Sequence, residues 1–199
     1  MKILKYLGVV FCCVAALSLT ACNDDDEQKS LTKEDVANCF LTVKGNYSGK
    51  LMYYTGEKKN DKFVKDSVLS TWSIQSDSVL TIDKFPSKAL AAFVSDSTVK
   101  KALEAAPAQD LKCRIGFVQT SPVAFIANPI TPTFNLNYGG ADHKVQVVFY
   151  INNTASYGVY SATGKAMTIQ LIEGPLFIDG KQTSYQTQSV PLLMTGNKI

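Results

Sequence analysis

The sequence predicts a mainly β domain, an antiparallel sandwich or open barrel with two or three short helices. About ten short segments alternate apolar and polar residues, which is the period of a half-buried strand. Turn residues separate these segments at short intervals, as in hairpins. Few stretches carry apolar residues at helical spacing, so the fold class is mainly β. The apolar fraction of 46% in 199 residues is ordinary for a globular chain.

The first predicted element is a helix over about residues 33–41. Thr32 and Asp35 have the spacing of a capping box, and Leu31 and Val36 have that of a hydrophobic staple. Four apolar residues at i, i+3, i+4 and i+7 give this helix one apolar stripe: Val36, Cys39, Phe40 and Val43.

Strands are predicted next, over residues 43–53, 64–75 and 79–82. A polar turn over residues 56–62 joins the first two, and Asp77-Ser78 joins the second to the third. The alternation in the second strand places Trp72 on its buried face, with Val68 and Ile74.

Two helical stretches interrupt the strands. One opens at Phe85-Pro86, where proline suits a first helical turn. The other covers about residues 97–105, with Asp96 as its cap and Pro107 ending it. The remaining strands are predicted over 111–117, 123–126, 134–138, 145–149, 157–161, 167–171, 176–178 and 183–194, with Gly139-Gly140 and Asp179-Gly180 as turns.

The amino terminus has the pattern of a secretion signal over residues 1–21. Lys2 and Lys5 precede an apolar stretch that is too short for a comfortable membrane span. It ends in Leu19-Thr20-Ala21-Cys22, which resembles the bacterial lipobox, and this predicts cleavage before Cys22 and lipidation of its thiol.

Residues 22–30 are predicted to form a disordered tether, because four consecutive carboxylates, Asp24 to Glu27, repel one another and stay solvated. The run is similar to the acidic signal that follows the lipidated cysteine in surface lipoproteins of Bacteroidetes. That resemblance implies an outer-membrane, cell-surface location and attachment to the membrane through Cys22. No further boundary appears, so residues 31–199 are expected to form one β-rich domain.

Charge composition argues against nucleic-acid binding. The net charge is +3, and Arg114 is the one arginine among 20 basic residues. Arginine is the preferred side chain for phosphate recognition, so no nucleic-acid partner is expected.

Catalytic and metal-binding patterns are weak. His143 is the one histidine, and we expect a surface histidine rather than a catalytic base. Its neighbour Asp142 points to the opposite face of a strand, so it is poorly placed to orient the ring. Neither a metal site nor a cofactor is expected, because the mature body has only Cys39, Cys113 and His143 as soft ligands, far apart in sequence. A hydrolase site built from two carboxylates is not excluded by the sequence, because any two of four aspartates near turns can meet in space: Asp61, Asp66, Asp77 and Asp83.

Three kinds of candidate site remain. Cys39 and Cys113 either form a disulfide in an oxidising envelope or pack as two free thiols. Three Asp-Ser dipeptides followed by Val or Thr resemble the O-glycosylation sequon of Bacteroidetes envelope proteins, at Ser67, Ser78 and Ser97; Asp-Ser is also a common turn and capping pair. Aromatic residues outside the clean alternation are candidates for a ligand-binding platform: Tyr54, Tyr150, Tyr157, Tyr160 and Tyr185.

The lipobox, the acidic tether, the Gly45 to Tyr53 strand, the Ser73 to Ala92 passage and Phe177-Ile178-Asp179-Gly180 together resemble an uncharacterised family of small Bacteroidetes lipoproteins. The resemblance implies no catalytic residue. We expect a non-enzymatic surface binding or adhesion module for a glycan or peptide. The alternatives are an accessory subunit of an outer-membrane complex and, third, a carboxylate-based hydrolase of envelope polymers.

Overall fold

The computed structural model describes residues 30–199. The predicted signal peptide, the lipidation at Cys22 and nearly all of the tether lie outside these residues. None of the helices within the described range is long and apolar enough to cross a membrane.

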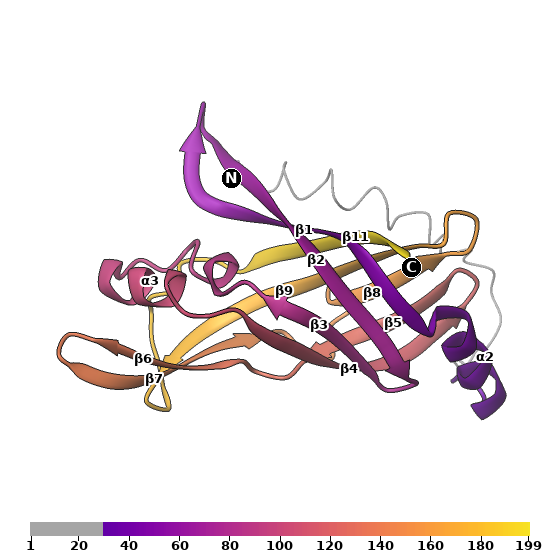
Figure 1. Ribbon diagram of the computed structural model, residues 1–199. Coiled ribbons are helices and arrows are strands. Elements are labelled where there is room, and N and C mark those ends of the chain that lie inside the picture. Colours follow the sequence, from indigo (N-terminus) through magenta and orange to yellow (C-terminus); the bar gives the residue numbers. More distant parts are fainter. Residues whose placement is uncertain (1–29) are drawn as a thin grey trace, which may run out of the picture. The chain divides into compact units, whose positions relative to one another are not determined.

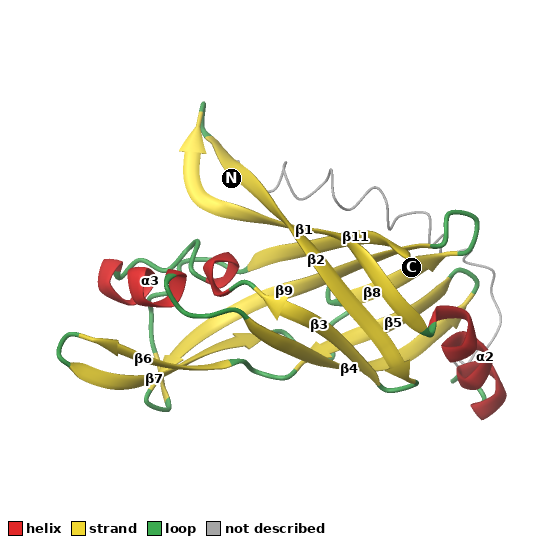
Figure 2. Cartoon of the chain, in the orientation of Figure 1, coloured by secondary structure: helices red, strands yellow, loops and turns green. Residues whose placement is uncertain are grey.

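The domain is mostly β, as predicted (Figure 2). Its helices are α2 (Lys33–Val43), the short 3-10 helix η2 (Ser87–Leu90) and α3 (Ser97–Glu104). Its strands are β1 (Gly45–Lys59), β2 (Lys62–Ser76), β3 (Val79–Phe85), β4 (Gln109–Thr120), β5 (Val123–Pro129), β6 (Thr133–Tyr138), β7 (Ala141–Phe149), β8 (Tyr157–Ser161), β9 (Ala166–Ile178), β10 (Lys181–Gln182) and β11 (Val190–Lys198).

Eight of these strands form a closed antiparallel barrel, in the order β11-β1-β2-β3-β4-β5-β8-β9. Strand β11 closes it, because one of its edges pairs with β1 and the other pairs with β9. The β6–β7 hairpin continues the sheet from β9 outside this ring (Figure 1). The antiparallel β class is therefore confirmed, whereas the barrel is closed rather than open and is not a two-sheet sandwich.

Alternating side chains fill the barrel. On β2, Trp72 is 1% exposed and Ile74 is fully buried, so the predicted register of this strand is confirmed. The rings of Trp72 and Tyr47 lie parallel with their centroids 5.8 Å apart. Tyr160 meets Tyr47 edge-on, at 6.4 Å. Aromatic residues from three strands therefore meet inside the barrel.

One end of the barrel carries α2 and the other carries η2 and α3 (Figure 1). The predicted capping box of α2 is confirmed, since the Asp35 N–H donates to Thr32 Oγ1 at 3.1 Å and the Thr32 N–H donates to Asp35 Oδ2 at 3.0 Å. Cys39 and Val43 from α2 are buried against the barrel. At the opposite end, α3 has the predicted cap, Asp96, whose carboxylate accepts from two N–H groups of its first turn.

Several strand boundaries differ from the prediction. The strands expected over 167–171 and 176–178 form the single strand β9, and the hairpin of β1 and β2 is longer than expected. Strand β1 ends at Lys59 and strand β2 begins at Lys62, so the turn between them consists only of Asn60 and Asp61. The sequence had predicted a longer polar loop over residues 56–62. Both turn residues have positive φ, 51° and 60°, which is the conformation of a tight hairpin turn whose twist matches the strands. The long hairpin projects beyond the barrel (Figure 1).

The last strand also begins later than expected. β11 starts at Val190, and residues 183–189 form an irregular segment that we call the strap. The Ser95 N–H donates to Tyr185 O at 2.8 Å and the Thr187 N–H donates to Phe93 O at 3.1 Å. The Thr183 N–H at the start of the strap donates to Leu176 O of β9 at 2.9 Å, so the strap shares its backbone hydrogen bonds between β9 and the segment before α3.

Candidate functional site

A small polar hollow lies where the strap meets the end of β9. Its volume is about 190 Å³, and its lining is formed by Tyr150, Gly174, Pro175, Gln182, Gln186, Gln188 and Ser189. Three of these side chains are primary amides, which offer both donors and acceptors. The hollow is smaller than a typical drug-sized pocket, so it has room for a single ring or for one end of a longer ligand.

The hollow and α2 lie at opposite ends of the barrel. Lys198 near the end of β11 donates through Nζ to Thr42 O of α2 at 3.3 Å, and its N–H donates to Lys165 O at 2.9 Å. Residue 165 thus marks the α2 end of β9, while Gly174 marks the hollow. Nine residues of strand separate them, about 30 Å at the usual rise per residue.

Tyr150 forms the aromatic wall of the hollow. Its side chain is 43% exposed, and its N–H donates to Ile172 O at 3.0 Å, which fixes the backbone just after β7. Ser189 Oγ lies 3.2 Å from Tyr150 Oη and donates to it. A tyrosine that is 43% exposed and held through its hydroxyl offers aromatic surface for stacking against a ligand.

Glu173 lies directly behind the wall of the hollow. It occupies an inward position of β9, in phase with the buried Ile169 and Leu171, and it is 1% exposed. Gln186 Nε2 donates to Glu173 Oε1 at 3.1 Å, whereas Glu173 Oε2 and Gln186 Oε1 are buried without a hydrogen-bond partner. Burial raises the pKa of Glu173 well above its ordinary value, because desolvation disfavours the charged carboxylate.

Neither Glu173 nor the glutamines of the hollow were predicted from the sequence as site residues. A signal for Glu173 is present, because a carboxylate stands at an inward position of an otherwise apolar alternation, Met167-Ile169-Leu171. Charged residues are almost never fully buried unless paired, so this position carried information about a site. The glutamines have no such signal, because they lie in an irregular segment.

The predicted aromatic platform is not assembled as one surface. Tyr160 is 6% exposed and packs against Tyr47 inside the barrel, so it is not available to a surface ligand. Tyr54 lies on the projecting hairpin, edge-on to Phe63 at 6.2 Å. Tyr157 and Tyr185 are half-buried, on β8 and on the strap. Of the residues proposed, Tyr150 is the one that lines the hollow.

His143 has a partner that the sequence did not indicate. Its Nδ1 lies 2.8 Å from Asp179 Oδ2, and its ring stacks on Tyr138 with centroids 4.2 Å apart. The hydrogen bond from His143 is the main cause that lowers the pKa of Asp179, and Asp179 also accepts from the Lys144 N–H at 2.9 Å. Within residues 30–199 no serine or cysteine bonds to His143, so this histidine–aspartate pair fastens the β6–β7 hairpin to the turn after β9.

The two cysteines are free and far apart. Cys39 Sγ on α2 lies 3.7 Å from Gln119 O near the end of β4, whereas Cys113 is fully buried in the middle of the same strand. Six residues separate Gln119 from Cys113, about 20 Å of strand. A disulfide requires Cα atoms within about 7 Å, so the structure does not bring these thiols together. Desolvation raises the pKa of both thiols.

The three serines of the Asp-Ser dipeptides are all exposed: Ser67 on β2, Ser78 in the β2–β3 turn and Ser97 at the start of α3. Asp96 caps α3, which agrees with the interpretation of Asp-Ser as a turn and capping pair. Asp66 bonds instead to Tyr53 Oη at 2.8 Å and lies 3.7 Å from Lys88 Nζ. Glycosylation at these serines stays a prediction.

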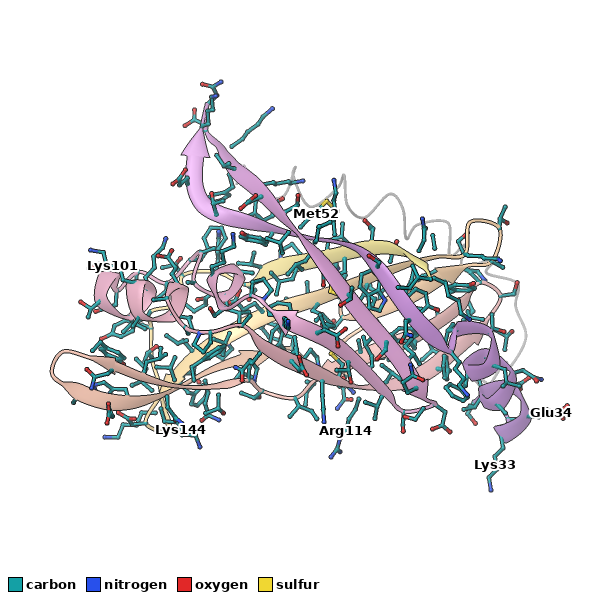
Figure 3. The ribbon with its side chains drawn as sticks, viewed as in Figure 1. Lys33, Glu34, Met52, Lys101, Arg114 and Lys144 are labelled. Carbon is teal, nitrogen blue, oxygen red and sulfur yellow. The ribbon has the colours of Figure 1, made fainter. Side chains whose placement is uncertain are left out.

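Charged side chains occur on several parts of the surface, and the projecting β1–β2 hairpin carries four exposed lysines: Lys58, Lys59, Lys62 and Lys65. Figure 3 shows Lys33 and Glu34 on α2, Arg114 on β4, Lys101 on α3 and Lys144 on β7, each projecting outward from a different part of the domain. In the described part of the chain, no group of three or more His, Cys, Asp or Glu side chains is placed to hold a metal ion.

The fold and the hollow define a small closed β-barrel protein with a polar recess at the end remote from α2. A family model described as a domain of unknown function, DUF4840, matches residues 42–178, and the chain belongs to this family. Neither the curated proteins nor the solved structures include a match to this chain. The predicted membership of an uncharacterised family is therefore confirmed, while its lipoprotein character stays a prediction. The family match covers β1 to β9 and stops before the strap and β11.

Proposed function

We propose that this protein is a lipid-anchored, non-enzymatic binding module on the outer-membrane surface, and that it binds one ring of a glycan in the hollow beside Tyr150. The observation that carries the proposal is the lining: a half-exposed aromatic ring together with Gln182, Gln186, Gln188 and Ser189. Hydroxyl-rich rings offer C–H faces for stacking and many hydrogen-bonding groups at their edge, which these side chains complement.

The position of the hollow supports surface presentation. The proposed anchor at Cys22 precedes α2 by about ten residues, which span at most about 35 Å when fully extended. The hollow is at the barrel end opposite α2, because Lys165 of the α2 end and Gly174 of the hollow lie nine residues apart along β9. An anchor joined to one end leaves the other end free to meet a ligand from outside the membrane.

Two other candidates are weaker. An accessory subunit needs an apolar docking surface, and Leu69 of β2, 85% exposed, favours this second function. A glycosidase needs two carboxyl groups flanking the substrate. Among residues 30–199 the hollow has a single carboxyl group beside it, that of Glu173. Two of the aspartates noted in the sequence have partners elsewhere, since Asp66 is bonded to Tyr53 and Asp83 to Thr71.

Binding to an oligosaccharide array, followed by calorimetry on each hit, tests the glycan proposal. Tyr150→Ala should weaken binding at least tenfold, whereas Tyr150→Phe, which keeps the ring, should cost about threefold. Gln182→Ala should also weaken binding, and Gln75→Ala is its matched control, since Gln75 is an exposed glutamine of β2 bonded to Asn46. Glycan hits unaffected by Tyr150→Ala and Gln182→Ala, or no hits, would refute the proposal.

The anchor is tested separately. Cys22→Ala should leave an uncut or soluble form, and the intact mass of the native protein should include lipid on Cys22. A mature amino terminus elsewhere, without lipid mass, would remove the anchor from the proposal and leave the binding site untouched.

A further inference from the structure

The tip of the projecting β1–β2 hairpin carries an excess of positive charge. Residues 57–65 contain four exposed lysines and two exposed acids, Glu57 and Asp61, so four positive charges minus two negative charges leave +2. Within residues 30–199 no carboxylate oxygen lies within 4 Å of these four amines, because the ion pairs found there are Lys88–Asp66 and His143–Asp179. The domain therefore does not pair the lysines of the hairpin with its own acids.

One face of the hairpin places two lysines directly against each other. Lys59 is opposite Lys62 across the two-residue turn. Side chains directly opposite in an antiparallel pair have Cβ atoms about 4.5–5.5 Å apart, and like charges at such positions destabilise the pair. A hairpin that ends on two facing ammonium groups is thus improved by a bound anion.

The other two lysines lie over aromatic rings on the opposite face. Lys58 Nζ is 5.0 Å from the centroid of Phe63, and Lys65 Nζ is 5.4 Å from the centroid of Tyr54. Each lysine is also the register partner of the residue whose ring it covers. Such contacts orient an ammonium group without compensating its charge, so both amines stay available to an anion.

The hairpin and the hollow are connected through the strap. The base of the hairpin contributes two rings to a small apolar cluster: Tyr54 and Phe63 pack with Ala92, Phe93 and Val190. Phe93 O accepts from the Thr187 N–H of the strap at 3.1 Å, and Val190 directly follows Ser189 of the hollow. A chain of several sugar rings is long enough to contact both features.

We propose that the β1–β2 hairpin is a docking surface for an acidic polysaccharide, whose carboxylates pair with its four unpaired lysines. Lysine is a compact charge with rotatable donors on a flexible stem, which suits anionic groups that recur along a chain and vary in position. This inference rests on the proposed function for its choice of a glycan, and it adds that the glycan is anionic.

Three other anionic partners fit the hairpin less well. Nucleic acid is recognised preferentially by arginine, and Arg114 lies opposite Val79 beside the β2–β3 turn, at the other end of β2. A membrane surface is disfavoured because residues 57–62 include no apolar side chain to insert. A protein partner normally contacts about 20–30 residues a side, whereas this tip is a narrow two-stranded projection (Figure 1).

The test uses two ligands that differ only in charge: an oligogalacturonate and the same oligomer with every carboxyl group methyl-esterified. Calorimetry on the full chain at neutral pH should show at least about tenfold tighter binding of the acid. The affinity for the acid should fall at least about threefold when the ionic strength rises from about 20 to about 150 mM, because salt screens exposed charges. Oligothymidylate and phosphatidylglycerol vesicles are tested beside them as the competing anions.

Paired substitutions locate the binding surface. Lys59→Gln with Lys62→Gln should weaken binding of the acid at least about fivefold. Lys33→Gln with Lys112→Gln is the matched control, because it removes the same charge from exposed positions on α2 and β4, and it should change the affinity less than twofold. Lys58→Gln with Lys65→Gln must also weaken binding, and this pair decides the matter if the first variant does not fold.

Each other outcome overturns a definite point. Equal affinity for the acid and the ester, no binding of the acid, or an equal loss in the control pair overturns the hairpin proposal. Tighter binding of oligothymidylate or of the vesicles, lost in the same lysine variants, overturns the assignment to a polysaccharide. A loss in the lysine variants without any loss in Tyr150→Ala supports the hairpin and counts against the hollow. Neutral glycans that depend on Tyr150, without a preference for acids, leave the proposed function standing and overturn this inference.

Discussion

Gly158→Ala should destabilise the barrel strongly, because the ring of Phe125 occupies the space that a side chain at residue 158 needs. The two residues face each other across β5 and β8. A Cβ atom added at Gly158 would lie 2.1 Å from Phe125 Cζ, 2.4 Å from Cε2 and 2.7 Å from Cε1, whereas ordinary contact begins at 3.4 Å. The tip of the ring must therefore move by the difference, 1.3 Å.

The surroundings decide how much that movement costs. Phe125 is fully buried and meets Phe117 edge-on with centroids 5.9 Å apart, so its ring has no open space to enter. Overpacking of a core costs about 1–3 kcal/mol, and loss of a buried phenylalanine's packing costs about 3–5 kcal/mol. We expect the free energy of unfolding to fall by about 3 kcal/mol, measured by urea unfolding with circular dichroism and Trp72 fluorescence.

A double-mutant cycle separates this mechanism from a general effect on the strand. Phe125→Leu shortens the side chain that collides, so it should be less harmful in Gly158→Ala than in the wild type, with a coupling of at least about 1 kcal/mol. Gly116→Ala is the matched control: this strand glycine of β4 has no heavy atom within 4 Å of an added Cβ, and its change should stay within about 0.5 kcal/mol. A Gly158→Ala effect as small as the control's, or an additive cycle, would refute the reasoning.

Two further predictions concern the ends of the barrel. Thr32→Ala removes the oxygen that accepts from the Asp35 N–H at 3.1 Å, so the free energy of unfolding should fall by about 1 kcal/mol in the same urea assay, while Thr32→Ser should keep the cap. The folded pKa of Asp179 is lowered by His143, so its stabilising contribution is present above the unfolded value of about 3.9 and is lost as pH falls through the folded value. Asp179→Asn should therefore lower the melting midpoint at about pH 5–6 and match the wild type at about pH 2; an equal difference at both pH values would contradict this account.

Local patterns in the sequence were sufficient for most elements. The capping box at Thr32 and Asp35, the cap at Asp96 and the alternation that buries Trp72 involve residues within a few positions of one another, and all three are present in the structure. Helix caps and strand alternation depend on the spacing of residues that are close together in the chain, and this spacing can be read from a single sequence. The short turn at Asn60-Asp61 was also local, and it was missed because lysines on both sides resemble a polar loop.

Sites that depend on distant residues were not predictable in the same way. His143 is oriented by Asp179, 36 residues away, and not by its neighbour Asp142. The hollow combines Tyr150 after β7, Gly174 in β9 and the glutamines of the strap. Tyr160 was placed on a platform because it lies outside the clean alternation of apolar and polar residues, but in the closed barrel it packs inward against Tyr47.

The sequence by itself determined the β class, the helix caps, the inward face of the strand that carries Trp72 and the expectation of an anchored envelope protein, because each follows from residue type and short-range spacing. The tertiary structure alone decided that the sheet closes, since closure requires β11 to pair with β1 on one edge and with β9 on the other. That pairing brings Met194 opposite Leu51, 143 positions earlier in the chain. Cross-strand partners at this separation are selected by the register of the whole ring and leave no periodic signal in either strand.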